Sequence, residues 1–288
     1  MSSLRPQWLD GLVDASTMYS WASYHFARTL FTSLRQGIIP LSSTQWQKIR
    51  DSSFSDFWLA FSAPSLAASP DAPVSNSASL VPLLLQKASG VVLDLGPGSG
   101  SQMPHLRSPE IKTIYGAEPC TGLHDQLLAQ ATRFNMQDKY KILSCSAELE
   151  PLVSELEQHG LITEKNDTGV FDTVISVRVL CSVPNPEQTI SDLYALLRPG
   201  GKMLICEHVV NPWRNGGSFV ARCFQFLFMK MGWSFLIGDC CLDRDTMALL
   251  VKAAERDGGW EENALEVSAE YCLFPYVFGY LVKKGAAQ

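Results

Sequence analysis

The chain has 288 residues, of which 46% are hydrophobic and 18% are charged, and its formal net charge is −6. This length accommodates one substantial core with an accessory region. Binding to a nucleic-acid backbone requires a basic face, so the negative charge excludes nucleic acid from the expected partners.

The cysteines and the N-terminus indicate the compartment. Eight cysteines are scattered along the chain without a C-x-x-C pair, and Cys240-Cys241 has no histidine at zinc-ligand spacing. We therefore expect reduced thiols and no bound metal. The start MSSLRPQWLDG lacks the basic head and apolar block of a signal peptide, which favours a cytoplasmic protein.

Residues 1–62 carry aromatic side chains at helical intervals, with a turn signal at 37–43. They predict three or four short helices that form either a cap packed on the main core or a lid over a substrate cleft. Residues 63–79 are rich in Ser, Ala and Pro and predict a linker, because such a segment buries little apolar surface. The third expected domain is residues 80–288.

From residue 80 onward, short apolar runs alternate with helical segments. Strands are predicted at 91–95, 112–117, 140–144, 171–177 and 201–207, and helices at 122–135 and 186–197. This alternation is typical of an α/β fold with a parallel sheet. Two further strand-like runs flank Pro275 and predict a C-terminal hairpin.

The stretch VVLDLGPGSG (91–100) is typical of a strand that enters a tight glycine turn. Glycines are needed where a ligand approaches the backbone or where φ is positive. Gly96, Gly98 and Gly100 follow G-x-G-x-G, one residue shorter than the dinucleotide fingerprint, and the lysine of a phosphate-binding loop is missing. The spacing therefore favours an adenosyl ligand without phosphates.

Acidic residues after the next two predicted strands support this interpretation. Glu118 ends the second strand, where a carboxylate can accept two hydrogen bonds from a ribose diol; the alternative is a solvated surface carboxylate. Ala147-Glu148 follow the third strand, where an adenine edge would lie. We also place Val177, at the end of the fourth strand, among the cofactor-binding residues.

Together, the 91–100 stretch, Glu118, FDTVIS and LLRPGGKMLICEHV resemble class I S-adenosylmethionine-dependent methyltransferases over residues 80–284. The resemblance implies a seven-stranded, mostly parallel Rossmann-like sheet whose last inserted strand is antiparallel. It implies that the three glycines line the methionine and ribose parts of S-adenosylmethionine and that Glu118 holds the ribose hydroxyls. It further implies that Asp94 orients the amino-acid end of the cofactor through water.

The second half is similar to the methyltransferase-like thiol methyltransferases, which methylate small alkyl thiols on endoplasmic reticulum and lipid droplets. The shared segments are VLCSVPNPEQTISDLYALLRPGG, EHV, WSFLIGDCCLDR and VFGYLVKK. This chain has the aromatic helical region in place of their N-terminal apolar anchor, and Asp239 and Cys241 in place of their Gly and Asn. The long N-terminal region looks more like fungal enzymes of secondary metabolism.

The acceptor determines whether the enzyme needs a base. A thiol, with a pKa near 8.5, ionises with modest help, whereas an alcohol requires a strong base. His208, after the fifth strand, is the candidate base, and Cys181, after the fourth, is expected near the transferred methyl. The alternatives are a structural histidine and a small packing residue. Trp233, Asp239 and Cys240 are candidates for the substrate pocket.

We therefore predict methyl transfer from S-adenosylmethionine to a small molecule, with a thiol as the favoured acceptor. The alternatives are an O-, N- or C-methyltransferase of a secondary metabolite, or a pericyclase-like enzyme that binds the cofactor without methylating. The apolar stretch 219–237 is interrupted by Arg222, Gln225 and Lys230, so it predicts a buried or interfacial helix with peripheral membrane contact rather than a spanning one.

Overall fold

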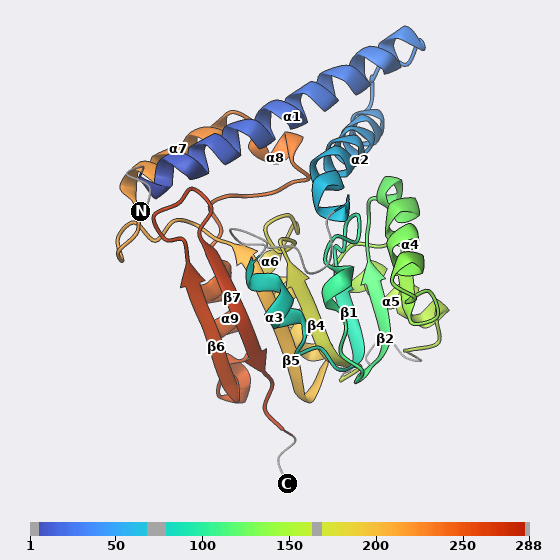
Figure 1. The fold of residues 1–288 in the computed structure, drawn as a ribbon, viewed down its shortest axis with the longest axis vertical. Helices are drawn as coiled ribbons and strands as arrows, with labels where there is room; N and C mark the ends of the chain where they lie inside the picture. Colours follow the sequence, from blue (N-terminus) through green and yellow to red (C-terminus); the bar gives the residue numbers. More distant parts are fainter. Residues whose placement is uncertain (1–5, 68–78, 163–168, 286–288) are drawn as a thin grey trace.

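The structure, a computed structural model, describes residues 6–67, 79–162 and 169–285 (Figure 1). Its strands are β1 (Gly90–Leu95), β2 (Ile111–Ala117), β3 (Tyr140–Leu143), β4 (Phe171–Val177), β5 (Leu197–His208), β6 (Glu262–Ser268) and β7 (Tyr276–Val282). Its α-helices are α1 (Gln7–Arg35), α2 (Ser43–Ala67), α3 (Val81–Leu85), α4 (His124–Arg133), α5 (Leu149–Gln158), α6 (Pro186–Leu196), α7 (Phe219–Lys230), α8 (Trp233–Leu236) and α9 (Thr246–Lys252).

The strands form one seven-stranded sheet in the order β3-β2-β1-β4-β5-β7-β6. Neighbours from β3 to β5 pair in parallel, whereas β7 is antiparallel to both β5 and β6. The expected seven-stranded α/β sheet with an inserted antiparallel strand is thereby confirmed. The order reverses beside β1, so a ligand crevice is expected at the carboxyl ends of β1 and β4.

Both faces of the sheet are covered by helices, which explains the apolar strand sequences. On one face, Leu93 and Leu95 pack with the buried sides of α5, α6 and α9. On the other, Val92 packs with α3 and α4. A third apolar cluster lies between the N-terminal helices and the α7–α8 segment.

The fifth strand differs from its prediction, because it begins at Leu197 rather than at residue 201. Leu197 pairs with Phe171, and a register shift follows before Thr173 pairs with Lys202. The Pro199-Gly200 turn therefore bulges out of the strand instead of preceding it.

The expectation of three or four short helices in residues 1–62 was wrong. Two long helices, α1 and α2, occupy residues 7–67 apart from the short connection between them. Serine and threonine hydroxyls inside α1 bond back to the preceding turn, as Thr17 does to the carbonyl of Val13 at 2.8 Å. Such residues are tolerated within a helix when they bond in this way. α1 ends before Gly37, which has a φ of +78°, a typical helix stop.

α2 begins with a reciprocal cap between Ser42 and Gln45. The Gln45 amide donates to the Ser42 hydroxyl at 3.3 Å, and the Gln45 side chain accepts from the Ser42 amide at 3.1 Å, which forms a capping box. The helix continues to Ala67, into the expected linker 63–79, of which residues 68–78 lie outside the described residues.

α1 and α7 run side by side across the carboxyl end of the parallel strands (Figure 1), where Trp8 and Phe224 stack. α7 buries Ala221, Gln225 and Phe228 on one side, at the spacing of an amphipathic helix. Phe219 and Phe226 are exposed. Within the described residues no helix has the length and apolarity needed to cross a membrane, and peripheral contact through 219–237 stays a prediction.

Candidate active site

The glycine turn follows β1 at the carboxyl edge of the sheet. Gly96, Gly98 and Gly100 have φ values of +49°, +60° and +79°. Residues other than glycine rarely adopt such positive φ values. The Gly96 amide donates to the carbonyl of Ala117 at 2.8 Å, which ties the turn to the end of β2. The sequence pattern thus reflects a real backbone requirement.

Glu118, directly after β2, lies against this turn. Its two carboxylate oxygens accept hydrogen bonds from the backbone amides of Gly98 and Cys120, each at 2.8 Å. The side chain is buried, and burial raises the pKa of this carboxyl even though the two amides favour the ionised form. Glu118 is therefore not a solvated surface residue.

Asp94, at the penultimate position of β1, is completely buried beneath the turn. It accepts hydrogen bonds from the Gln102 side-chain amide at 2.8 Å and the Tyr140 hydroxyl at 2.7 Å. Burial raises the pKa of Asp94 to about 7, against the lowering effect of these two donors, and the nearby Glu118 adds to the rise. Sequence reasoning did not find Gln102 or Tyr140, because neither stands in a recognisable motif.

The remaining predicted cofactor residues lie near the same edge. Ala147 is buried in the loop after β3, whereas its neighbour Glu148 is exposed and accepts a hydrogen bond from the Ser146 hydroxyl at 3.3 Å. Val177 is the last residue of β4 and is buried within the core.

The N-terminal helices cover the glycine turn directly. A Cβ atom at Gly98 would lie 2.7 Å from the indole nitrogen of Trp58 on α2, and the hydroxyls of Ser99 and Ser62 are 2.8 Å apart. Residue spacing does not reveal such contacts between distant segments. They place α2 beside the predicted cofactor position.

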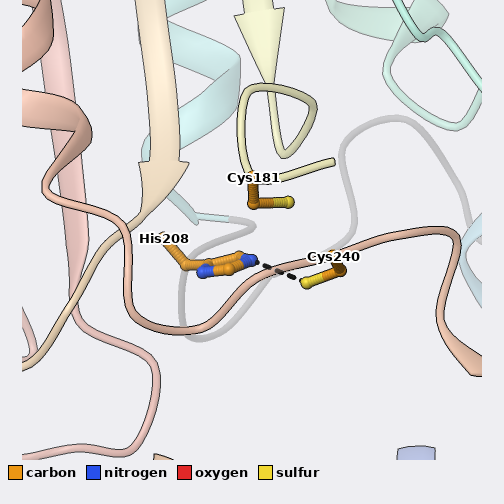
Figure 2. Close-up of side chains that lie close together, drawn as sticks. All are labelled: Cys181, His208 and Cys240. Atoms are coloured by element: carbon orange, nitrogen blue, oxygen red, sulfur yellow. Dashed lines mark hydrogen bonds between the residues drawn. The ribbon is translucent and has the colours of Figure 1, made fainter. Parts of the chain in front are cut away.

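Three other predicted residues converge at one buried point (Figure 2). Cys181 lies in the loop after β4, His208 ends β5, and Cys240 lies in the loop after α8. The His208 Nε2 atom is 3.1 Å from the Cys240 sulfur. The hydrogen bond to Cys240 and burial raise the pKa of the Cys181 thiol well above its usual value.

Aromatic side chains surround this point, of which Trp233 is buried and Phe274 and Tyr276 are half-buried. Trp233 donates its indole N–H to the Cys240 sulfur at 3.3 Å, while Phe274 and Tyr276 contact the His208 ring edge to face. Burial lowers the pKa of His208 and the Cys181 thiol raises it, with a net rise. Among described residues, the Nδ1 atom of His208 is buried without a hydrogen-bond partner.

Asp239 has a different environment from Cys240. It is exposed, has a φ of +59°, and forms an ion pair with Arg50 of α2 at 2.6 Å. Arg50 also donates to the carbonyl of Phe235 at 3.0 Å and stacks over its ring. Asp239 thus joins the α8 loop to the N-terminal helices.

A sequence profile of the family described as a methyltransferase domain matches residues 74–254, more than half of the chain. The chain therefore belongs to the methyltransferase domain family. This membership confirms the expected class, an S-adenosylmethionine-dependent methyltransferase, and agrees with the glycine turn after β1 and the seven-stranded sheet.

Two curated human proteins share local similarity with the chain. Thiol S-methyltransferase TMT1B is 37% identical over 78 residues, which cover 27% of this chain and 30% of that protein. Thiol S-methyltransferase TMT1A is 29% identical over 115 residues, which cover 40% of this chain and 45% of that protein. The chain thus spans less than half the length of either relative.

Solved structures share the fold at low identity. An O-methyltransferase family protein from Burkholderia thailandensis superposes with a TM-score of 0.50 at 14% identity, over 88% of this chain and 64% of that one. Geranyl diphosphate C-methyltransferase from Streptomyces coelicolor superposes with a TM-score of 0.50 at 13% identity, over 85% of this chain and 99% of that one. That structure is a complex with Mg²⁺, geranyl diphosphate and S-adenosyl-L-homocysteine. At these identities the likeness concerns the fold alone.

Proposed function

We propose that the protein transfers the methyl group of S-adenosylmethionine to the sulfur of a small-molecule thiol. The glycine turn suits the cofactor because Gly96, Gly98 and Gly100 leave the backbone free of Cβ atoms. Glu118 would accept hydrogen bonds from the ribose hydroxyls, using the carboxylate oxygens that already fix the turn at 2.8 Å. Asp94 would orient the cationic amino-acid end through water.

The adenine ring would lie between the loop after β3, at Ala147 and Glu148, and the end of β4, at Val177. These residues share the carboxyl edge of the sheet with the glycine turn, the usual ligand position in such folds. The helices α1 and α2 would act as a cap that shapes the acceptor pocket, with Trp58 closest to the turn.

The assignment of a thiol as the acceptor rests on the local similarity to two human thiol S-methyltransferases. The chemistry of the site is compatible with it. Methyl transfer is an in-line displacement in which the enzyme supplies position, desolvation and a deprotonated acceptor. Cys181, after β4, and His208, at the end of β5, meet Cys240 of the loop after α8, a set of two thiols and one imidazole that suits an easily ionised acceptor. The nearby Glu207 carboxylate is engaged by the Ser176 hydroxyl at 2.7 Å and the Val179 amide at 2.8 Å.

His208 was expected as a base, and its Nε2 atom is directed at Cys240. A base acting on the acceptor would therefore have to use Nδ1 or exchange partners. Trp233 and the surrounding aromatic residues would line the apolar part of the pocket. Both roles stay predictions, as do a place in secondary metabolism and a cytoplasmic location.

The proposed activity is tested by measuring S-adenosylhomocysteine formation with matched panels of alkyl thiols, phenols and amines. We expect turnover with thiols and at least about tenfold lower kcat/KM with phenols and amines of similar size. Turnover confined to oxygen or nitrogen acceptors would overturn the thiol assignment. Tight cofactor binding without turnover on any acceptor would favour the pericyclase-like alternative.

A further inference from the structure

Cys181, His208 and Cys240 form a cluster of metal-ligand groups. Their ligand atoms all lie within 4.8 Å of one another, and the three side chains are 3%, 6% and 7% exposed. Two thiolates and an imidazole are typical zinc ligands, because zinc prefers sulfur and nitrogen in a tetrahedral arrangement. Buried cysteines packed only as small hydrophobes have no reason to converge on an imidazole.

We propose that these three residues bind one zinc ion and leave its fourth coordination position open. Among the described residues, no further His, Cys, Asp or Glu joins the cluster. A structural zinc site usually has four protein ligands, whereas a site with three protein ligands admits water or substrate.

The separation of His208 and Cys240 is close to that expected in a tetrahedral zinc site. Zinc–sulfur and zinc–nitrogen bonds of about 2.3 and 2.0 Å imply tetrahedral ligand separations of about 3.5 Å between N and S and about 3.8 Å between two sulfurs. The observed His208–Cys240 distance is 3.1 Å, so this pair needs to separate by about 0.4 Å, while the two pairs that include Cys181 lie within 4.8 Å.

The two cysteine loops are already held together. The amide of Cys241 donates to the carbonyl of Cys181 at 2.9 Å, and Arg244 donates to the carbonyl of Leu180 at 2.6 Å. His208 is fixed at the end of β5, opposite Tyr276 of β7. The ligands are therefore pre-organised by three separate segments of the fold, as a metal site requires.

The surroundings favour sulfur in its anionic form once a cation is present. The indole N–H of Trp233 points at the Cys240 sulfur at 3.3 Å, and such a donor stabilises a metal-bound thiolate. A bound divalent ion holds its cysteine ligands in the thiolate form.

The cluster lies next to the predicted methyl donor. Val179, two residues before Cys181, would be 2.8 Å from a Cβ atom at Gly96. Trp58, which covers Gly98, packs against the same apolar cluster that contains Cys181 and Cys240. The open position of the zinc ion would therefore be within reach of a substrate placed beside the cofactor.

The position of the site beside the methyl donor suits a small thiol as the zinc-bound substrate, an assignment that rests on the proposed thiol methylation. A small thiol would enter the open position, lose its S–H proton to water and bind zinc as a thiolate. Its sulfur would then attack the sulfonium methyl group. The new S–CH₃ bond forms as the old one breaks, which gives a thioether and S-adenosylhomocysteine.

The first test measures metal in the full-length protein. After purification without chelator, we expect about one zinc per chain by mass spectrometry of metal content. After removal with chelator, titration with Co²⁺ alone should give the intense absorption of tetrahedral cobalt with a thiolate-to-cobalt charge-transfer band. A wild-type chain that holds neither zinc nor cobalt stoichiometrically, or whose cobalt spectrum lacks the thiolate band, overturns the proposal, whatever the variants do.

Variants then locate the site. Cys181→Ser and Cys240→Ser each remove one sulfur ligand while keeping side-chain size, and we expect each to weaken cobalt binding at least about 100-fold. Cys145→Ser is the matched control, since Cys145 is also buried but lies outside the cluster. Equal cobalt binding by all three variants would overturn the ligand assignment.

Turnover measured in parallel separates the two proposals. We expect the chelated protein to methylate thiols at least about 100-fold more slowly than the zinc-reconstituted protein. Undiminished methylation of thiols by the metal-free protein would overturn the role of zinc and uphold the thiol acceptor. Stoichiometric zinc binding with no turnover on any thiol would uphold the metal site and overturn the acceptor.

Discussion

Replacing Asp94 by Asn should flatten the pH dependence of stability in the cofactor-free protein. Burial raises the pKa of Asp94 to about 7 in the folded chain, whereas an unfolded aspartate ionises near 3.9. Between these values the folded state binds more protons than the unfolded state. The free energy of unfolding therefore falls as the pH rises from about 4 to 7, and it levels off above pH 7.

The magnitude follows from the difference in pKa. Three pKa units at about 1.4 kcal/mol each lower the free energy of unfolding by about 4 kcal/mol in total. About 3 kcal/mol of this decrease falls between pH 5 and pH 8. For a chain of 288 residues, about 3 kcal/mol corresponds to a shift of about 5 °C in Tm. An asparagine carbonyl still accepts from Tyr140, and the Gln102 amide can rotate to meet the new NH₂ group, so the variant should fold.

The measurement is thermal unfolding of both proteins across pH 5 to 8. Between pH 5 and pH 8, the Tm of Asp94→Asn should rise relative to the Tm of the wild type by about 5 °C. Asp138→Asn, at an exposed position, serves as the control and should follow the wild-type curve. If wild type and Asp94→Asn run parallel over this range, Asp94 does not titrate there and the reasoning about its burial is wrong.

Three further substitutions probe the site and its cap. Glu118→Gln should weaken cofactor binding about tenfold or more by calorimetry, because an amide replaces the charged acceptor that faces the Gly98 N–H. Gly98→Ala should lower stability by about 1–3 kcal/mol and weaken cofactor binding, since its Cβ would meet Trp58. Gly37→Ala is the control, because Gly37 also has a positive φ but its Cβ would have no atom within 4 Å. It should lower stability by about 1 kcal/mol and leave cofactor binding unchanged. Arg50→Ala should change stability by less than about 1 kcal/mol but raise KM for the acceptor, because its guanidinium joins α2 to the α8 loop.

The sheet and the glycine turn could be predicted from local sequence patterns. Strand and helix alternation is a local signal, and buried parallel strands must be apolar on both faces, so β1, β2 and β4 could be placed to within a residue. Glycine at 96, 98 and 100 is likewise dictated by local backbone angles. The position of Glu118 followed from the end of β2.

The helical region was harder to predict from sequence. The aromatic side chains at helical intervals and the turn signal at 37–43 led to a prediction of three or four short helices, whereas the structure has two long ones. Hydroxyls that bond to the preceding turn leave α1 intact. Between residues 7 and 67, the Gly37 to Ser42 segment separates the two helices, because there the chain combines a positive φ with a new helix cap.

The contacts between segments far apart in the chain could not be predicted in this way, because they depend on the assembled fold. Trp58 meets Gly98 through the packing of α2 on the sheet edge, and no periodicity encodes that meeting. His208 and Cys240 are 32 residues apart, so their spacing resembles no zinc motif. They meet Cys181 because parallel strands end at a common edge and the α8 loop folds back over it, which only the assembled fold provides.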